Sequence, residues 1–535
     1  HLGKSYRSGV DPAVVEFRGE YYMFVTRSWG YWHSKDLLNW DFITPEKWYF
    51  EGCNAPAAHN YKDSVLYVCG NPSGAMSILY TDNPKRGDWK AVPSVLHDLQ
   101  DPALFIDDDE RAYMYWGSSN RWPIRGKELD MKNKFLPIAK KPDSLLFLRP
   151  DIHGWERFGE NHTSDIKPFI EGAWMTKHNG KYYLQYAAPG TQFNVYGDGV
   201  YVGKSPLGPF EYAAHNPFCY KPGGFATGAG HGSTVCGPGG IYWHFGTIHL
   251  SINYKFERRL CMFPTFFDED GAMYSDTYFG DYPHYSPDQV SRQTTSGGFR
   301  GWMLLSYGKP VKASSQLESY PVENVTDENL KTFWVAEKND DKQWVEIDLE
   351  EVSDVYALQL NFFDYEETGF WGRMPNLRQR YLVEASVDGA RWRVLVDYRN
   401  SFRDAPHNYI ELDQPIEARY IRYRHHYVPG KNLAMGDIRV FGLGRGKKPA
   451  TVKGFTVVRE ADERNARISW KAVKGAQGYN VLWGVALDKL YSSWMVYGDN
   501  SLDLRALTVG QKYYFAIEAF NENGISQRVF LREAH

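Results

Sequence analysis

The stretch VDPAVVEFRGEYYMFV, residues 10–25, contains the pattern that decides the fold of the first half of the chain. Its two apolar runs, rich in valine and tyrosine, are separated by Arg18-Gly19-Glu20. Short runs of this kind around a glycine turn predict two antiparallel β-strands. Asp11 stands directly before the first run, 11 residues ahead of Tyr22. The stretch therefore predicts a hairpin with a carboxylate at the start of its first strand.

The same pattern returns four more times before residue 300. Tyrosine-rich or aromatic runs at 65–68, 112–116, 181–184 and 241–244 each follow a turn that is rich in glycine or aspartate. Counting back 11 or 12 residues from each run gives five equivalent positions: Asp11, Ala55, Asp101, Glu171 and His231. These positions lie 44, 46, 70 and 60 residues apart, a spacing typical of one four-stranded propeller blade each.

We therefore predict a five-bladed β-propeller over residues 1–300. The innermost strand of each blade lines the axial channel, so the starts of these strands converge although they are far apart in sequence. Three carboxylates and a histidine then share one end of the channel. An insertion, GWERFGENH at 154–162, precedes Glu171. It either frames the mouth of the pocket or packs as a surface loop.

The sequence changes character after about residue 300. Alternating segments such as QWVEIDL at 343–349 and DIRVF at 437–441 predict a β-sandwich over 310–442. A basic, glycine-rich linker then leads to a third unit over 450–535. There Leu507, Gly510 and Tyr513 have the spacing that places a tyrosine at a sandwich corner. The predicted fold class is all-β: a five-bladed β-propeller followed by two β-sandwich domains.

The composition limits the classes of partner that we expect for this chain. The 535 residues carry 61 basic and 65 acidic side chains, no basic run and no stretch of about 18 apolar residues. We therefore expect no nucleic acid partner and no membrane span. Eighteen Trp and 38 Tyr favour β structure and suit sugar binding, since an aromatic ring covers the apolar face of a pyranose. The chain begins at His1, and we expect an exported protein whose signal peptide is already absent: periplasmic, at the cell surface or extracellular.

Five cysteines, an odd number, show no spacing of a metal site. They all lie in apolar, strand-like contexts in the first half of the chain: Cys53, Cys69, Cys219, Cys236 and Cys261. Buried free thiols are the favoured interpretation, and one disulfide is the alternative.

Three carboxylates at one end of a channel suit the hydrolysis of a glycosidic bond. One acid must protonate the leaving oxygen, and one carboxylate must activate water. The two need different environments so that their pKa values diverge, and a third carboxylate supports this by like-charge repulsion. The constellation indicates a glycosidase that requires no cofactor for its chemistry.

The first 300 residues resemble glycoside hydrolase family 43, a family of five-bladed propellers. The resemblance rests on four segments: SGVDPA at 8–13, SKDLLNW at 34–40, DPALFIDDD at 101–109 and EGAWM at 171–175. It implies that Asp11 is the general base, Glu171 the general acid, and Asp101 the residue that modulates the pKa of that acid and orients it. The family inverts the anomeric centre, which implies a water beside the base and roughly 6.5–9.5 Å between the two carboxyls.

The resemblance also implies contacts to substrate and metal. Arg258 resembles the arginine that reaches the sugar in the first subsite, and the adjacent Arg259 is the alternative match. His231 resembles a channel histidine that in many members faces a structural calcium; a hydrogen-bonded core histidine is the alternative. The aromatic residues expected to contact the sugar are Trp29, Trp116 and Trp174.

The resemblance leaves the substrate open. We expect an exo-acting enzyme on a polysaccharide or oligosaccharide, with α-L-arabinofuranosidase favoured by its frequency in the family. β-Xylosidase, galactofuranosidase and exo-galactanase are alternatives, and a non-catalytic glycan-binding surface protein is the alternative of another class. Residues 310–442 resemble the discoidin, or coagulation-factor C-type, domain, with Phe370-Trp371 as a candidate glycan contact. Residues 450–535 resemble fibronectin type III.

Overall fold

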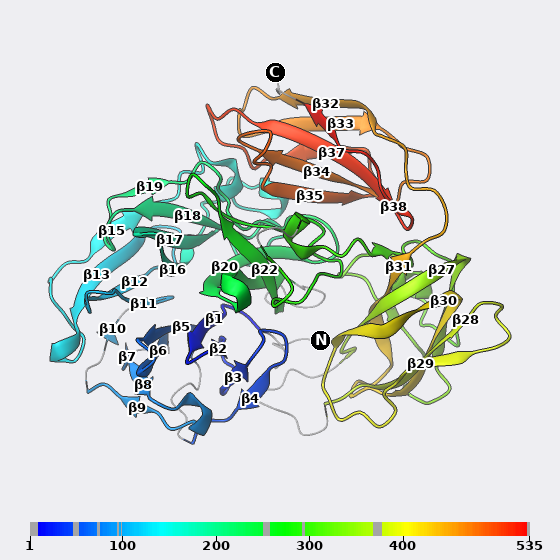
Figure 1. The fold of residues 1–535 in the computed structure, drawn as a ribbon, viewed down its shortest axis with the longest axis horizontal. Helices are drawn as coiled ribbons and strands as arrows, with labels where there is room; N and C mark the ends of the chain where they lie inside the picture. The colour runs from blue at the N-terminus through cyan, green and yellow to red at the C-terminus, as the bar shows by residue number, and fades with distance from the viewer. Residues whose placement is uncertain are drawn as a thin grey trace.

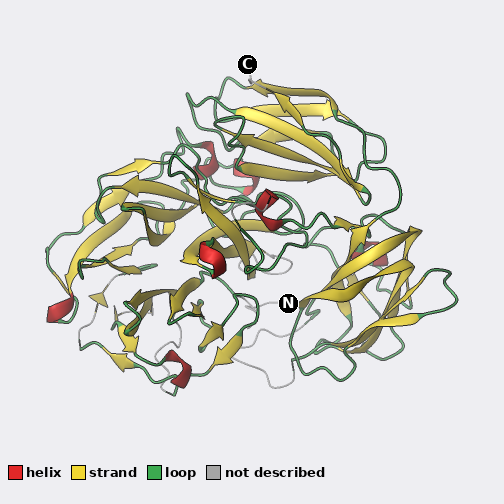
Figure 2. Ribbon diagram, in the orientation of Figure 1, coloured by secondary structure: helices red, strands yellow, loops and turns green. Residues whose placement is uncertain are grey.

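The computed structural model describes residues 9–46, 53–71, 75–93, 96–97, 99–249, 257–291, 295–366 and 377–531. Strands dominate these residues, and every helix among them is a 3₁₀ turn of three or four residues (Figure 2). In this described part, no helix has the length and apolarity needed to cross a membrane. The all-β class is therefore confirmed.

Five antiparallel sheets follow one another along the first half of the chain (Figure 1). The first holds β1 (Ala13–Phe17), β2 (Glu20–Phe24), β3 (Tyr31–Ser34) and β4 (Asp41–Ile43); the second holds β5 (Asn54–Tyr61), β6 (Val65–Asn71), β8 (Leu79–Thr81) and β9 (Lys90–Ala91). The third holds β11 (Ala103–Ile106), β12 (Ala112–Trp116), β13 (Ile124–Asp130), β14 (Leu136–Pro137) and β15 (Asp143–Leu146). The fourth holds β16 (Glu171–His178), β17 (Lys181–Ala188), β18 (Gly197–Gly203) and β19 (Phe210–Tyr212); the fifth holds β20 (Thr227–Cys236), β21 (Tyr242–His249), β22 (Arg258–Phe267) and β23 (Met273–Ser275). A separate pair, β7 (Ala75–Met76) and β10 (Leu96–His97), lies beside the second sheet.

The hairpins predicted from turn residues are present. Arg18 and Gly19 join β1 to β2 with φ angles of 55° and 77°, and Asn179 and Gly180 join β16 to β17 with 48° and 73°. Two consecutive positive φ angles match the twist of the flanking strands, and glycine adopts this conformation without a steric penalty. These turns set the register that repeats from sheet to sheet.

The first strands of the five sheets form a closed ring. β1 contacts β5, β5 contacts β11, β11 contacts β16, β16 contacts β20, and β20 contacts β1 again. Apolar clusters fill the spaces between neighbouring sheets; Val15 and Tyr22 of the first sheet, for example, pack with Leu66 and Val68 of the second. Segments far apart in sequence therefore start side by side around one axis.

The second unit contains one network of paired strands. Their spatial order is β24 (Met303–Leu304), β31 (Ala434–Leu443), β27 (Trp344–Phe362), β30 (His407–Tyr427), β28 (Arg380–Ser386) and β29 (Arg393–Asp397). β25 (Val311–Ala313) pairs with β27, and β26 (Trp334–Val335) pairs with β31. The unit has its own buried core, which includes Trp334, Leu358 and Val440.

The third unit contains two sheets. One has the order β32 (Lys453–Arg459), β33 (Ala466–Lys471) and β36 (Ser501–Leu504). The other has the order β35 (Ser492–Tyr497), β34 (Gly478–Gly484), β37 (Tyr514–Asn521) and β38 (Gly524–Ile525), with β39 (Val529–Leu531) on β37. The Tyr513 hydroxyl accepts a hydrogen bond from the Thr508 backbone N–H, as a corner tyrosine does.

The third unit is continuous with the fourth sheet rather than separated from it. One apolar core includes Tyr186 and Trp155 from the first unit and Trp470 and Trp483 from the third. Trp155 is fully buried, and the backbone N–H of the adjacent Gly154 donates to the Leu507 carbonyl at 2.8 Å. This end of the 154–162 insertion is therefore packed against the third unit, in agreement with the packing alternative.

None of the five cysteines forms a disulfide bond. Cys53, Cys69 and Cys219 are buried, as predicted, and Cys69 and Cys219 lie in the apolar layers between strands. Cys261 is half-buried, and Cys236 is exposed at the end of β20, so the prediction of burial is wrong for Cys236.

Candidate active site

A left-handed backbone bend lies within each inner strand or just before it. The φ angles are 55° at Asp11, 42° at Ala55, 49° at Asp101, 65° at Gly172 and 50° at His231. Non-glycine residues seldom occupy this region, and strain of this kind concentrates at functional sites. The repeat predicted from the sequence is therefore a repeat of backbone geometry.

The fourth bend corrects one of the equivalences. It lies at Gly172 rather than at Glu171, so the carboxylate of the fourth sheet stands one residue earlier than the other predicted positions. The strand register breaks between Glu171 and Trp174, as it does between Gly230 and Ser233 in the fifth sheet. A Cβ atom on Gly172 would lie 2.8 Å from His231 Cγ, so glycine is required here by space as well as by φ.

The bends bring the predicted residues together. His231 Nδ1 lies 3.3 Å from Asp11 Oδ1 and 3.9 Å from Asp101 Oδ2. Side-chain atoms of Asp101, Glu171 and His231 lie within 4.8 Å of one another. The side chains of Asp11, Asp101 and His231 keep only 10% to 12% of their surface exposed. Three carboxylates and one histidine thus converge in a largely buried cluster, which we call the carboxylate cluster.

The two adjacent arginines face different environments. Arg258 Nη1 lies 3.9 Å from Asp11 Oδ1 and donates to Thr191 Oγ1 at 2.8 Å. Arg259 instead contacts His407 of the second unit and Glu257. Successive side chains of a strand point to opposite sides, so only one of two neighbours can face the cluster. Of the two alternatives, Arg258 is the residue beside the carboxylates.

Hydroxyl groups orient the carboxylates. The Tyr196 hydroxyl donates to Glu171 Oε1 at 2.7 Å, and the Ser118 hydroxyl donates to Glu171 Oε2 at 3.1 Å. The Thr26 hydroxyl donates to Asp11 Oδ2 at 2.7 Å. Asp11 and Glu171 therefore have a fixed orientation before any ligand arrives.

A buried carboxylate holds the bend at His231. Asp198 is fully buried and accepts the backbone N–H groups of His231 at 2.8 Å and Gly232 at 2.9 Å. Its Oδ2 also lies 2.9 Å from His244 Nε2, another fully buried group. This support fixes the strained backbone from which His231 projects.

The sequence interpretation did not identify Tyr196, Asp198 or Ser118. Their contacts with Glu171 and His231 join residues 25 to 53 positions apart. One local signal was present: Asp198 stands between Gly197 and Gly199 in an apolar strand, an unusual place for a carboxylate.

The electrostatics of the cluster follow from its crowding. Burial, together with the nearby acids Glu171 and Asp11, raises the pKa of Asp101 to about 7 against the opposing effect of His231. Burial alone disfavours the charged imidazole, but Asp11, Asp101 and Glu171 outweigh it and raise the pKa of His231. Asp101 therefore changes its charge near neutral pH.

The three tryptophans are placed differently from one another. Trp174 packs against the core between the first two sheets and donates its indole N–H to the Thr234 carbonyl at 3.3 Å. Trp116 packs against the core between the second and third sheets. Trp29 is half-buried in the loop after Thr26, with a φ of 60°. Packing accounts for Trp116 and Trp174, and sugar contacts by all three stay predictions. Phe370-Trp371 lie outside the described residues.

The donor set at His231 fits calcium poorly. Calcium takes six to eight oxygen ligands. Here a ring nitrogen accompanies the carboxylates of Asp101 and Glu171, and both oxygens of Glu171 already accept hydrogen bonds. We therefore derive no step through a metal, and a calcium role for His231 stays a prediction.

Two family models match this chain. Residues 7–273 match the model described as glycosyl hydrolases family 43, and residues 310–435 match the F5/8 type C domain. A Beta-xylosidase of Xylanibacter ruminicola is 33% identical over 202 residues, which cover 34% of this chain and 57% of that protein. Xylosidase/arabinosidase 43A of Humicola insolens is 30% identical over 140 residues, which cover 21% and 40%. Arabinoxylan arabinofuranohydrolase of Bacillus subtilis is 30% identical over 189 residues, which cover 31% and 34%.

The matches span only 34% to 57% of the length of these three relatives. The family model, in contrast, covers the five sheets almost from end to end and includes every residue of the carboxylate cluster. The chain therefore carries a domain of glycosyl hydrolases family 43, followed by an F5/8 type C domain.

Proposed function

We propose that this protein is an inverting glycoside hydrolase in which Asp11 is the general base, Glu171 the general acid and Asp101 the modulator of that acid. The convergence of three carboxylates from three separate sheets with His231 of β20 and Arg258 of β22 carries the proposal. Glycoside inversion requires an acid and a base on opposite sides of the sugar, and acids that lie on different sheets can flank a ligand.

Asp11 is oriented for the role of base. Thr26 holds Oδ2, while Oδ1 faces His231 and Arg258. In the proposed reaction, a water held by Asp11 attacks the anomeric carbon and gives its proton to the carboxylate. Arg258, anchored by Thr191, is then placed to bind a sugar hydroxyl in the first subsite.

Glu171 is oriented for the role of acid. Tyr196 holds one oxygen, so the other, beside Ser118, can present a proton to the leaving oxygen. Asp101, with a pKa of about 7, adjoins Glu171, and Ser118 contacts both residues. A neighbouring acid that changes its charge near neutral pH alters the electrostatic potential at the acid beside it.

The proposed substrate is the terminal sugar of a polysaccharide or oligosaccharide. α-L-Arabinofuranosidase remains our first choice, and β-xylosidase is supported equally by the names of the relatives. Galactofuranosidase and exo-galactanase are further alternatives. Loop side chains around the pocket decide between these sugars.

A panel of nitrophenyl glycosides tests this proposal. The panel holds α-L-arabinofuranoside, β-D-xyloside and β-D-galactofuranoside, with arabinoxylan as the natural polymer. We expect release of sugar by the wild type and a loss of about 10³-fold in Glu171→Gln, because general acid catalysis is removed. Proton NMR of the first product should show the inverted anomer. If neither the panel nor the polymer yields free sugar, the protein is a glycan-binding module without catalysis.

The architecture belongs to the same proposal. The five sheets, with their closed ring of first strands, support a five-bladed propeller over 1–300. We propose β-sandwiches over 310–442 and 450–535, the latter of fibronectin type III kind, which the Tyr513 contact supports. We also propose export, because polysaccharides lie outside the cell, and glycan binding by the F5/8 type C domain.

A further inference from the structure

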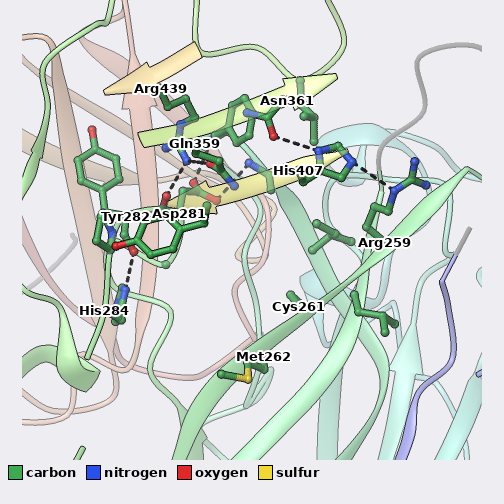
Figure 3. Close-up of a pocket in the computed structure, with 18 of the residues that line it drawn as sticks. Arg259, Cys261, Met262, Asp281, Tyr282, His284, Gln359, Asn361, His407 and Arg439 are labelled. Carbon is green, nitrogen blue, oxygen red and sulfur yellow. Dashed lines mark hydrogen bonds between the residues drawn. The ribbon is translucent and has the colours of Figure 1, made fainter. Parts of the chain in front are cut away.

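A cavity lies between the fifth sheet and the F5/8 type C domain (Figure 3). Its volume is about 430 Å³, within the usual range of small-ligand sites. None of the residues of the carboxylate cluster lines it. Arg259 lines the cavity, while its neighbour Arg258 faces the cluster, so strand β22 separates the two sites. We call this space the junction cavity.

The second unit supplies a polar floor. Strands β30, β27 and β31 are neighbours, and Tyr409, Gln359 and Arg439 occupy paired positions across them. His407 and Asn361 form the adjacent row. Paired residues project from the same face of a sheet, so these five polar side chains form one surface. Figure 3 shows Gln359 bonded to Arg439, and His407 bonded to Asn361 and Arg259.

The first unit supplies a mostly apolar wall. Ile248, Leu260 and Phe263 come from the fifth sheet, and Phe225 and Tyr282 come from the segments beside it. A ligand in the junction cavity therefore meets hydrogen-bonding groups on one side and hydrocarbon or aromatic surface on the other. A sugar ring has this same division between hydroxyl groups and C–H faces.

The charges around the cavity are internally compensated. Arg439 pairs with Glu328 at 2.6 Å, Asp281 with Lys221 at 2.6 Å, and Arg259 with Glu257 at 3.3 Å. An anionic or cationic ligand finds no uncompensated countercharge among these groups. A neutral ligand with many hydroxyl groups suits the lining better.

We propose that the junction cavity binds a sugar residue of a neutral oligosaccharide without cleaving it. Tyr409, which is 42% exposed, lines the cavity at a solvent-accessible position where a longer chain can leave it. The inference rests on the proposed function in one respect, which is that the substrate oligosaccharide of the enzyme is the ligand. A sugar held on the far side of β22 keeps the substrate chain near the carboxylate cluster between cleavage events.

Calorimetric titration of the full-length Glu171→Gln variant tests the inference. The probes are xylobiose, L-arabinose and D-galactose, so that a chain and free monosaccharides are compared. We expect two classes of site for at least one probe. Adding Tyr409→Ala or Gln359→Leu should weaken one class about tenfold and leave the other unchanged. Phe530→Ala, which removes a comparably exposed aromatic residue from the third unit, is the control and should change neither class.

Two further measurements keep the outcomes separate. Unfolding midpoints of all variants identify any that fail to fold, and crystals soaked with xylobiose should then show a sugar beside Tyr409 and Tyr282. A single class of site, or two classes that ignore both substitutions, overturns the inference even if the enzyme hydrolyses glycosides. If hydrolysis is absent but binding depends on Tyr409, the proposed function fails and the inference stands.

Discussion

The carboxylate cluster and the interface between the first two units differ in how their buried charges are balanced. In the cluster, Asp11, Asp101 and Glu171 crowd around His231 and Arg258, with more acids than bases. At the interface, each of the buried charges named above has a partner of opposite sign, such as Arg439 with Glu328. Both regions are built on strand ends and strand faces, so secondary structure does not account for the difference.

A catalytic cluster must gain and lose protons, whereas the charges at a structural interface must stay constant. Crowded carboxylates raise one another's proton affinity, and this stores electrostatic strain in the folded state. A paired buried charge does no chemistry, but loss of its partner leaves an ion without compensation. Substitutions in the two regions should therefore act on different quantities: activity in the cluster and stability at the interface.

The largest effect is expected from Asp11→Asn. The amide cannot accept a proton from water, so kcat should fall about 10³-fold while the unfolding midpoint stays near that of the wild type. Steady-state rates on the best nitrophenyl glycoside, with thermal unfolding in parallel, measure both quantities. Asp143→Asn, an exposed carboxylate in the third sheet, is the control. A fall of less than tenfold would remove Asp11 from the role of base.

Arg439→Met should act on stability instead. The side chains of Arg439 and Glu328 are 2% and 1% exposed, and removal of one partner from such a pair costs about 3–5 kcal/mol. Urea unfolding should show the loss as a lower free energy of unfolding. The double variant with Glu328→Gln should recover part of the stability. A loss within error in the single variant would contradict the contrast between the regions.

Asp101→Asn should reveal the strain stored in the cluster. The pKa of Asp101 is about 7 in the folded state and 3.8 for the free side chain. Between about pH 4 and 7 the unfolded chain releases this proton while the folded protein retains it, so wild-type stability falls as pH rises. At about pH 8 the variant should be more stable than the wild type by roughly 1–3 kcal/mol, with no gain near pH 4. Urea unfolding across this range measures the difference, and a constant difference would argue against a raised pKa.

The smallest effect is expected from Arg467→Ala. Arg467 and Asp503 form an ion pair on the third unit, but their side chains are 52% and 46% exposed. Water screens such a pair, so neither activity nor the unfolding midpoint should change measurably. A clear destabilisation would show that the exposure of an ion pair does not predict its contribution to the stability of this protein.

Much of the cluster was predictable because the repeat is encoded locally. Asp11, Asp101 and His231 could be located by counting back from tyrosine-rich strands, since each hairpin has nearly the same length. The count gave Glu171 a position equivalent to the others, but the bend lies at Gly172. A one-residue shift of this kind is invisible to a pattern that is read from strand spacing alone.

The supporting contacts were not predictable in the same way. Tyr196 contacts the cluster from the loop before β18, and Asp198 contacts it from β18 itself. Nothing in their spacing along the sequence indicates which inner strand they contact. The choice between Arg258 and Arg259 also needed the structure, because neighbouring residues of a strand differ only in the side to which they point.

By itself, the amino-acid sequence determined the strand-rich class, the repeat of hairpins and the carboxylates at their starts, because turns and alternating strands depend on near neighbours. Only the tertiary structure decided that the five first strands close into a ring, that Asp198 holds the bend at His231, and that a cavity lies between the first two units. These features join residues far apart in the chain. Such contacts depend on how whole sheets pack, which no local pattern encodes.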